Sequence, residues 1–522
     1  MPIPEADTRL NMRAKGTEAL LQAGLFHSLH PLKDGVIKLR KKGNWKPYHT
    51  IWSMLFLGWF VSYIDRTATG PLITYMIEHE VAFFAGVDNP HAIGGLVGSL
   101  FFAGFMLMQF PGGALGDRFG YRTIIVLSIF WAGIATILTG IAGGLITFII
   151  LRVLLGLGEG VFYSNDRSYI SFHSPPDKVG LGMGIALTGV SVGLTVATLG
   201  VPLLLSWAEP RFGEHAWRVP FFVLGAITLF SAVLITIHLK PKQLPAGLDP
   251  QSPAAKAEYR KALPPLFGYS AVFLAVVMGI YLLAARFGVS DVGIAVLLTA
   301  LCPVLIVFVY RRRKEEIGPL LKNRNLLLMY LFFIPVMWHL WFYGFWAVSI
   351  VRDFGGNALV TAALIASFNG LAGIIGFPLG GMISDRAASR PNGRRNVLAV
   401  QTGIVAVLTF VFAGYVMAGY SNPVVLSLLL FVSGLFFFAL QPVAHALASD
   451  HAPEKQRGSM FGMLNLIAEV GAILSPVVSG AIRDASGNWG VPLLLDGALL
   501  AAAFLCALAV TSTSRKAAPS IA

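Results

Sequence analysis

The amino-acid sequence predicts an all-α polytopic membrane protein. Of its 522 residues, 56% are hydrophobic and only 12% are charged, whereas soluble proteins carry about 25% charged residues. The apolar residues form runs of the length that a membrane-spanning helix needs, about 20 residues. Basic residues flank several of these runs, as they do at the cytoplasmic ends of transmembrane helices. These observations exclude a soluble multidomain protein, a disordered chain and a coiled coil.

Fourteen apolar runs are each long enough to cross a bilayer. Six of them precede a polar stretch at 240–262, two follow this stretch, and six more follow a basic segment at 311–324. We therefore predict transmembrane helices near 51–73, 92–114, 122–142, 144–165, 180–206, 218–238, 266–286, 290–310, 325–350, 358–383, 396–418, 424–447, 459–480 and 490–511.

The two sets of six helices predict a duplicated architecture, because the second span of each set ends in a similar pattern. The matching residues are Phe110, Pro111, Gly113, Asp117 and Arg118 in one set, and Phe377, Pro378, Gly381, Asp385 and Arg386 in the other. Duplicated halves are a common plan of transporters. We predict six-helix bundles at 49–239 and 325–512, linkers with an inserted transmembrane hairpin (266–310) at 240–324, and tails at 1–48 and 513–522.

Charge in the loops predicts the orientation of the spans. The loop at 74–91 contains acidic residues but no Lys or Arg, whereas the next loop contains Arg118 and Arg122. Cytoplasmic loops are enriched in Lys and Arg, so both termini are expected in the cytoplasm. No cleavable signal peptide is visible in the first 48 residues, and the expected location is the plasma membrane.

The formal charge of +13 does not indicate nucleic-acid binding. The basic clusters at 38–42, 311–314 and 394–395 flank apolar runs, which is their place in a membrane topology. Cys302 and Cys506 lie inside apolar runs and offer neither a disulfide framework nor a metal site. No Ser-His-Asp spacing, HExxH or paired metal-ligand set is present. We therefore expect no enzyme activity, no cofactor and no metal.

A loop signature after the second span points to a family. Gly113-Ala-Leu-Gly-Asp117-Arg118-Phe-Gly120-Tyr-Arg122 resembles the loop between the second and third helices of the major facilitator superfamily, and Gly381 to Arg386 is a weaker copy. The resemblance implies that superfamily's fold of two six-helix bundles. It also implies a conformational latch at Gly113, Asp117, Arg118, Gly120, Arg122, Asp385 and Arg386; a solvated turn with basic topology signals is the alternative.

A narrower resemblance lies in the first and fourth spans. Tyr63-Ile-Asp65-Arg66 and the segment from Arg152 to Glu159, followed by Ser164-Asn-Asp-Arg167, are similar to the anion:cation symporter family. That family includes bacterial sugar-acid symporters, sialin and vesicular glutamate transporters. Segments near the last two spans, Pro453 to Gly458 and Asp484 to Trp489, resemble the same family.

The charged residues of these spans indicate function independently of the resemblance. Burying charges in a membrane costs several kcal/mol in order of magnitude, so Asp65, Arg66, Arg152 and Glu159 should face a cavity and pair. Arg152 and Glu159 are two helical turns apart and share one face. A buried carboxylate beside an arginine can exchange protons near neutral pH, because burial and the guanidinium act on it in opposite directions. A static buried salt-bridge network is the alternative.

The resemblance implies a role for each of these residues. Asp65 and Glu159 would be proton-coupling carboxylates, and Arg152 would pair with Glu159 until protonation frees it. Arg66 would bind a substrate carboxylate and Tyr63 a hydroxyl group.

Two departures from the family pattern bear on the substrate. Val190 stands where sugar-acid symporters tend to have a glutamine, which weakens the case for a polyol acid. Asn465 is kept, but Glu469 replaces a second asparagine. Glu469 is either a further proton-coupling site or a sign of a zwitterionic or less anionic substrate.

The ninth span is unusually aromatic. Trp338, Trp341, Phe342 and Phe345 recur at the spacing of one helical face. This stripe could stack on a ring-containing substrate, or it could be a packing or lipid-facing surface. His339 is either a proton relay and substrate contact or a hydrogen-bonded structural residue.

The expected function is proton-coupled symport of a small organic anion, a carboxylate such as a sugar acid or aromatic acid, by alternating access. A proton gradient would drive it, and a monomer in the lipid bilayer is the expected unit. An exchanger or exporter on the same fold and a membrane solute sensor remain alternatives. Gating motifs in both halves favour a transport cycle over sensing. We expect the hairpin to be a peripheral brace or a dimer contact.

Overall fold

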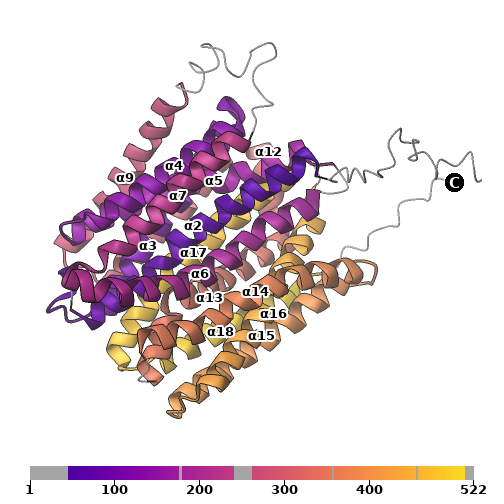
Figure 1. Ribbon diagram of the computed structural model, residues 1–522. Coiled ribbons are helices and arrows are strands. Elements are labelled where there is room, and N and C mark those ends of the chain that lie inside the picture. The colour runs from indigo at the N-terminus through magenta and orange to yellow at the C-terminus, as the bar shows by residue number, and fades with distance from the viewer. Residues whose placement is uncertain are drawn as a thin grey trace, which may run out of the picture. The chain divides into compact units, whose positions relative to one another are not determined.

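The structure is a computed structural model that describes residues 45–80, 82–175, 179–239, 261–355, 358–453 and 456–511. These residues form helices and connecting turns, and none of them is in a β-strand (Figure 1). The tails predicted at 1–48 and 513–522 and the linker at 240–262 lie largely outside the described residues. The all-α prediction is confirmed for the part of the chain that the structure describes.

The helices follow the predicted order. The first set contains α2 (Pro47–Glu78), α3 (Pro90–Phe119), α4 (Tyr121–Gly140), α5 (Leu145–His173), α6 (Val179–Phe212) and α7 (Arg218–His238). The inserted segment contains α9 (Leu263–Arg286), α10 (Asp291–Thr299), α11 (Leu301–Arg312) and α12 (Lys314–Lys322). The last set contains α13 (Arg324–Gly355), α14 (Leu359–Ala387), α15 (Gly393–Met417), α16 (Pro423–His451), α17 (Arg457–Ser486) and α18 (Gly490–Ala509).

The described helices agree with the predicted spans. Thirteen segments are long and apolar enough to cross a membrane, with Asp291–Arg312 counted as one. The remaining predicted span, 51–73, lies within α2, which is 32 residues long. The eighth span differs from its prediction because it breaks into α10 and α11 around Ala300. Pro303 explains the break, since a proline cannot donate the backbone hydrogen bond to the residue four positions before it.

The two sets of six helices pack in the same way. In the first set α2 contacts α6, α3 contacts α5, and α4 contacts α7. In the last set α13 contacts α17, α14 contacts α16, and α15 contacts α18. We call the two sets the N bundle (α2–α7) and the C bundle (α13–α18). Equivalent pairs in equivalent order make the bundles structural repeats, as the repeated motif predicted.

The bundles meet along α3 and α17, along α6 and α14, and between α2 and α13 (Figure 1). At two of these interfaces, a glycine allows the helix backbones to come close together. A Cβ atom at Gly95 would overlap the carbonyl oxygen of Pro476, and one at Gly70 would overlap that of Phe345. Only a residue without a side chain lets the backbones come this close.

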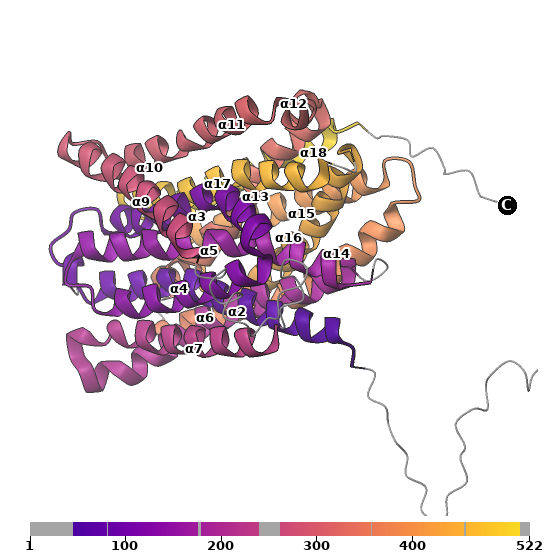
Figure 2. The ribbon, with the colours of Figure 1, turned by 90° about the horizontal axis from the view of Figure 1, so that it is seen from above.

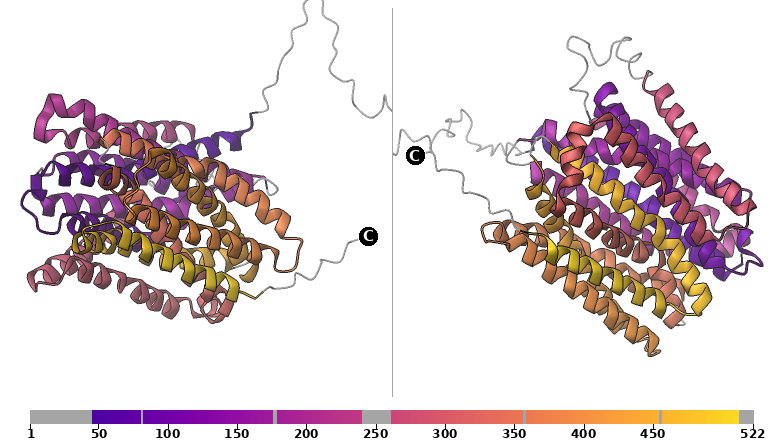
Figure 3. Two further views of the ribbon diagram at one scale, coloured as in Figure 1. Left: turned by 90° about the horizontal axis from the view of Figure 1, so that it is seen from below. Right: turned by 180° about the vertical axis from the view of Figure 1, so that it is seen from behind.

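The inserted hairpin runs along the outside of the bundles on the side of α3 and α17 (Figures 2 and 3). Its first helix, α9, contacts α3 and α5, whereas α10 contacts both α3 and α17. The hairpin therefore touches the N bundle and the C bundle at once.

Candidate functional site

The four charged residues predicted inside apolar spans lie together in the interior of the N bundle. Asp65 and Arg66 lie near the middle of α2, and Arg152 and Glu159 lie on α5. Each of the four is 5% exposed or less. Because a charge that faces lipid is costly, α2 and α5 pack with these side chains turned toward the protein interior.

Arg66 and Glu159 form an ion pair between α2 and α5. Arg66 Nε donates to Glu159 Oε2, and Ser62 Oγ donates to the same oxygen at 2.9 Å. The Arg66 guanidinium also lies 4.1 Å from the centre of the Phe105 ring. Arg66 Nη2 and Glu159 Oε1 have no hydrogen-bond partner among the described residues. Both members of the pair thus keep capacity for a further polar group.

Arg152 and Asp65 form a second polar cluster next to this pair. Arg152 Nη2 donates to the hydroxyl of Thr69 and lies 3.5 Å from the backbone oxygen of Asp65. The Asp65 carboxylate accepts a hydrogen bond of 3.1 Å from Thr228 on α7. Asp65 is therefore tied to α7 rather than to the Arg66–Glu159 pair.

The structure differs here from the expected pairing of Arg152 with Glu159. Two helical turns separate these residues by about 10 Å along α5. A shared face does not bring two such side chains together. Arg66, reaching across from α2, takes the place beside Glu159.

Glu469 and Asn465 face this region from α17 of the C bundle. Asn465 Nδ2 donates to Gln109 Oε1 of α3 at 2.6 Å, and Gln109 Nε2 donates to Glu469 Oε1 at 3.4 Å. Glu469 Oε2 has no partner among the described residues. Gln109 therefore links the two bundles. It is absent from the predicted site residues, although an amide side chain inside an apolar run was a visible signal.

Tyr63 and the aromatic stripe of α13 also meet between the bundles. The Tyr63 and Trp341 rings stack with centres 5.6 Å apart and planes 22° apart. Phe102 of α3 lies 4.5 Å from the same Trp341 ring. Trp338, Trp341, Phe342 and Phe345 are each 5% exposed or less. The stripe is thus an interior packing surface and does not face lipid.

His339 contacts α18 of the C bundle. Its Nδ1 lies 2.7 Å from Asp496 Oδ2. Trp338 instead packs near α17, where its backbone oxygen accepts a hydrogen bond of 2.8 Å from Ser475. The candidate residues of α13 therefore do not form one site.

The first copy of the latch motif joins α3 to α4. Gly120 lies between these helices with φ +87°, a conformation that favours glycine. Arg122 donates to the backbone oxygens of Thr236, at 2.7 Å, and Leu239 at the carboxyl end of α7. This contact is the expected one between an arginine and a helix C-terminus. Gly113 is partly buried and Arg118 is exposed, while the side chain of Asp117 lies outside the described residues.

The second copy of the motif is more open. Asp385 and Arg386 are exposed, and Asp385 lies 3.8 Å from Arg394. Arg394 Nη1 binds Asp450 of α16 at 2.6 Å and Arg394 Nε donates to Ser384 at 3.2 Å. The contacts of Arg122 and Arg394 thus stay within their own bundles. Arg394, which contacts Ser384, Asp385 and Asp450, was not among the predicted latch residues.

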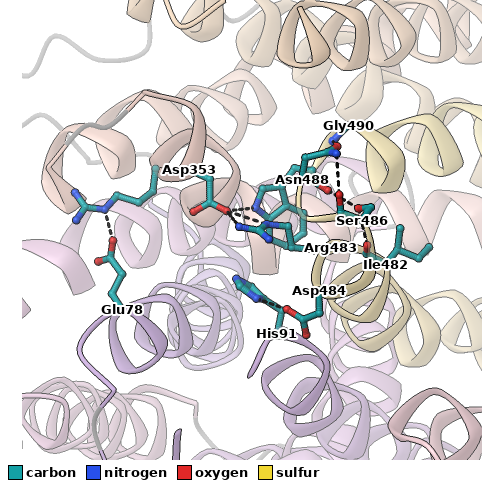
Figure 4. Close-up of polar contacts among 11 residues, drawn as sticks. Glu78, His91, Asp353, Ile482, Arg483, Asp484, Ser486, Asn488 and Gly490 are labelled. Carbon is teal, nitrogen blue, oxygen red and sulfur yellow. Dashed lines mark hydrogen bonds and ion pairs between the residues drawn. The ribbon is translucent and has the colours of Figure 1, made fainter. Parts of the chain in front are cut away.

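Polar contacts join the bundles at the end where α2 terminates, which we call the Glu78 end; the opposite end is the Pro47 end (Figure 4). Glu78 of α2 pairs with Arg352 of α13. His91 Nδ1 of α3 lies 2.6 Å from Asp484 Oδ1 of α17, and the Ala92 amide donates to Asp484 Oδ2 at 2.9 Å.

The C bundle is reinforced at the same end, where Asp353 accepts from Arg483 at 2.8 Å and from Trp489 at 2.9 Å. The ion pairs Glu78–Arg352 and His91–Asp484 between the bundles both lie at the Glu78 end. The sequence does not reveal these pairs, because the partners are hundreds of positions apart and are ordinary charges at helix ends.

Comparison with known proteins agrees with this arrangement. A family model described as Major Facilitator Superfamily matches residues 55–418 and 389–521. The chain is 28% identical over 466 residues to the probable sulfoacetate transporter of Cupriavidus necator, covering 89% of this chain and 94% of that one. It is 23% identical over 459 residues to the hexuronate transporter of Bacillus subtilis, covering 87% and 92%.

A solved structure of a D-xylose-proton symporter matches with a TM-score of 0.63 at 15% identity, covering 90% of this chain and 98% of that chain. At 15% identity this similarity shows the fold alone.

Proposed function

The chain belongs to the major facilitator superfamily, and on that premise we propose that it takes up a small organic anion together with protons by alternating access. It is an integral membrane transporter and not an enzyme. The names of its relatives, sulfoacetate and hexuronate transporters, support an organic acid as substrate.

The Arg66–Glu159 pair is the observation that supports proton coupling. One guanidinium can bind a substrate carboxylate in bidentate geometry, but here Glu159 occupies its Nε. A proton on Glu159 cancels the carboxylate charge and weakens this pair. Arg66 then binds the substrate anion in place of Glu159, and the buried net charge stays constant because one proton enters with one carboxylate.

Asp65 and Glu469 are further carboxylates in this proposal. Asp65 lies beside Arg152 and takes a proton when Arg152 changes partners. Glu469 approaches through Gln109 from the other bundle, so a proton or substrate bound there affects both bundles. Tyr63, Trp341 and Asn465 complete the proposed substrate site at the seam between the bundles, and Trp338 and His339 flank it.

The N bundle (49–239) and the C bundle (325–512) are the proposed moving units. In this proposal the contacts at the Glu78 end close that end, so entry of substrate from there requires Glu78–Arg352 and His91–Asp484 to separate. At the Pro47 end, the two motif copies would hold the bundles in the opposite state.

The proposed orientation places the Pro47 end and both termini on the cytoplasmic side of a bacterial-type plasma membrane. A monomer is the proposed working unit. A substrate would then enter through the Glu78 end.

Uptake into proteoliposomes tests the proposal. The purified chain is reconstituted and supplied with labelled sulfoacetate, glucuronate or galactonate, with and without an inwardly directed proton gradient. We expect one of these acids to accumulate only when the gradient is present. Exchange that ignores the gradient would indicate an exchanger, outward pumping an exporter, and binding without movement a sensor; each result contradicts proton-coupled uptake.

A further inference from the structure

A second pair of buried ionisable residues lies in the C bundle, apart from the Arg66–Glu159 pair. His339 of α13 is 1% exposed and Asp496 of α18 is 0% exposed. His339 Nδ1 and Asp496 Oδ2 are 2.7 Å apart. Asp496 Oδ1 and His339 Nε2 have no hydrogen-bond partner among the described residues.

The surroundings leave the imidazole as the group that compensates the Asp496 charge. Around His339, α13 contributes the Tyr343 ring at 4.7 Å and α16 contributes the Phe437 ring at 4.4 Å. The neighbouring helices α6 and α14 contribute Thr198 and Asn369, which are polar but uncharged. A buried carboxylate without compensation is costly, so the enclosed pair is favoured with the proton that leaves it no net charge.

His339 also lines a cavity between the bundles. The cavity has a volume of about 10 Å³, close to the room that one water molecule needs. Its walls include Leu194 and Thr198 of α6 in the N bundle and Tyr343 and Asn369 in the C bundle. Because Nδ1 faces Asp496, the free Nε2 edge of the ring is the one available to this cavity.

We propose that the His339–Asp496 pair is a second proton-binding site, opened and closed by the movement of the bundles. In the closed cavity the imidazolium keeps its Nε2 proton, because losing it would leave one negative charge buried. When α6 moves away from α13 and α14, water reaches Nε2 and accepts this proton. The neutral imidazole then still donates from Nδ1 to the Asp496 carboxylate.

The second proton-binding site rests on the proposed proton coupling and would add one proton to the number carried with each substrate. The number of protons carried per substrate is the measurement that tests it, obtained from the membrane potential that just balances a known substrate gradient in proteoliposomes. Asp496→Asn keeps an acceptor for Nδ1 but removes the charge that holds the proton. We expect this variant to carry one proton fewer per substrate than the wild type.

Asp450→Asn is the matched control, because it removes a carboxylate of the same bundle that pairs with Arg394 and lies outside the cavity. We expect its proton number to equal that of the wild type. A merely structural role of Asp496 would change rates or thermal stability without changing the proton number.

The outcomes separate this inference from the proposed function. A wild type whose transport ignores protons would overturn both. A coupled wild type and an Asp496→Asn variant with the same proton number would overturn the second site alone. Should the variant not transport, the ¹⁵N shifts of the His339 ring in the wild type, assigned by difference from His339→Gln, decide the question. A ring that stays neutral from pH 5 to 9 would then overturn the second site.

Discussion

At the scale of single residues, Arg66 has two competing partners in the proposed cycle. Glu159 binds it in this structure, and a substrate carboxylate binds it in the proposed cycle. Replacing one member of a buried pair leaves the other charge uncompensated, at a cost of about 3–5 kcal/mol. Binding and folding effects must therefore be separated by removing both charges together.

Arg66→Ala should destabilise the protein and abolish substrate binding. Arg66→Ala combined with Glu159→Gln should recover most of the thermal stability, because no buried charge is left unpaired, but binding should stay lost. Thermal unfolding and calorimetric titration with the transported acid measure the two effects. Binding at wild-type affinity in the double variant would show that another group recognises the anion.

The charged residues of this site can be predicted from the sequence, but their pairs cannot. Asp65, Arg66, Arg152 and Glu159 were found because charge inside an apolar run is a strong signal. The pairing of Glu159 was predicted with the wrong arginine, since spacing on one helix gives a shared face and not the contacts across helices. Asp496 carries the same signal in the last span and was overlooked.

At the scale of helices, glycine sets how closely the bundles approach. A Cβ atom at Gly95 of α3 would overlap the backbone of α17 at Pro476. The backbone cannot yield without moving the whole helix. The apolar runs predicted almost every helix, but these close approaches and the break at Ala300 depend on tertiary packing and proline placement.

Gly95→Ala should hold α3 and α17 apart and slow transport at least about tenfold. Gly279→Ala is the matched control, because a Cβ atom there meets no atom within 4 Å, and alanine favours a helix by about 1 kcal/mol over glycine. Initial uptake rates of the two variants make the comparison. Equal rates would show that the α3–α17 approach is not needed in the cycle.

The latch motif makes a separate prediction at this scale. Asp117→Asn should lower the uptake rate while leaving equilibrium substrate affinity close to that of the wild type, because the proposed latch acts on the movement of helices and not on the binding site. Asp385→Asn should have a smaller effect, since that carboxyl is exposed and 3.8 Å from Arg394. A wild-type uptake rate in the purified Asp117→Asn variant would show that Asp117 is not part of a latch.

Over the molecule as a unit, the contacts at the Glu78 end close that side in the proposed cycle. The repeated bundles were predictable from the duplicated motif, whereas the closed end was not. Partners such as His91 and Asp484 meet only after both bundles have folded. The family resemblance also implied alternating states without implying which one this structure adopts.

Exchanging the charges of one pair tests this closure. Glu78→Arg or Arg352→Glu alone should open the Glu78 end by placing like charges together, and the double exchange should close it again. Spin labels at Glu214→Cys and Ser421→Cys, with Cys302 and Cys506 replaced by alanine, report the distance between the bundles. Distances unchanged in both single variants would mean that this pair does not hold the end closed.

Glu159→Gln tests whether protonation of Glu159 couples substrate movement to the proton gradient. Glutamine imitates the protonated carboxyl and cannot release a proton. The variant in proteoliposomes should exchange labelled for unlabelled substrate at a rate comparable to the wild type, yet fail to accumulate substrate when a proton gradient is imposed. Accumulation to the wild-type level would contradict the account and leave Glu159 as a structural partner of Arg66.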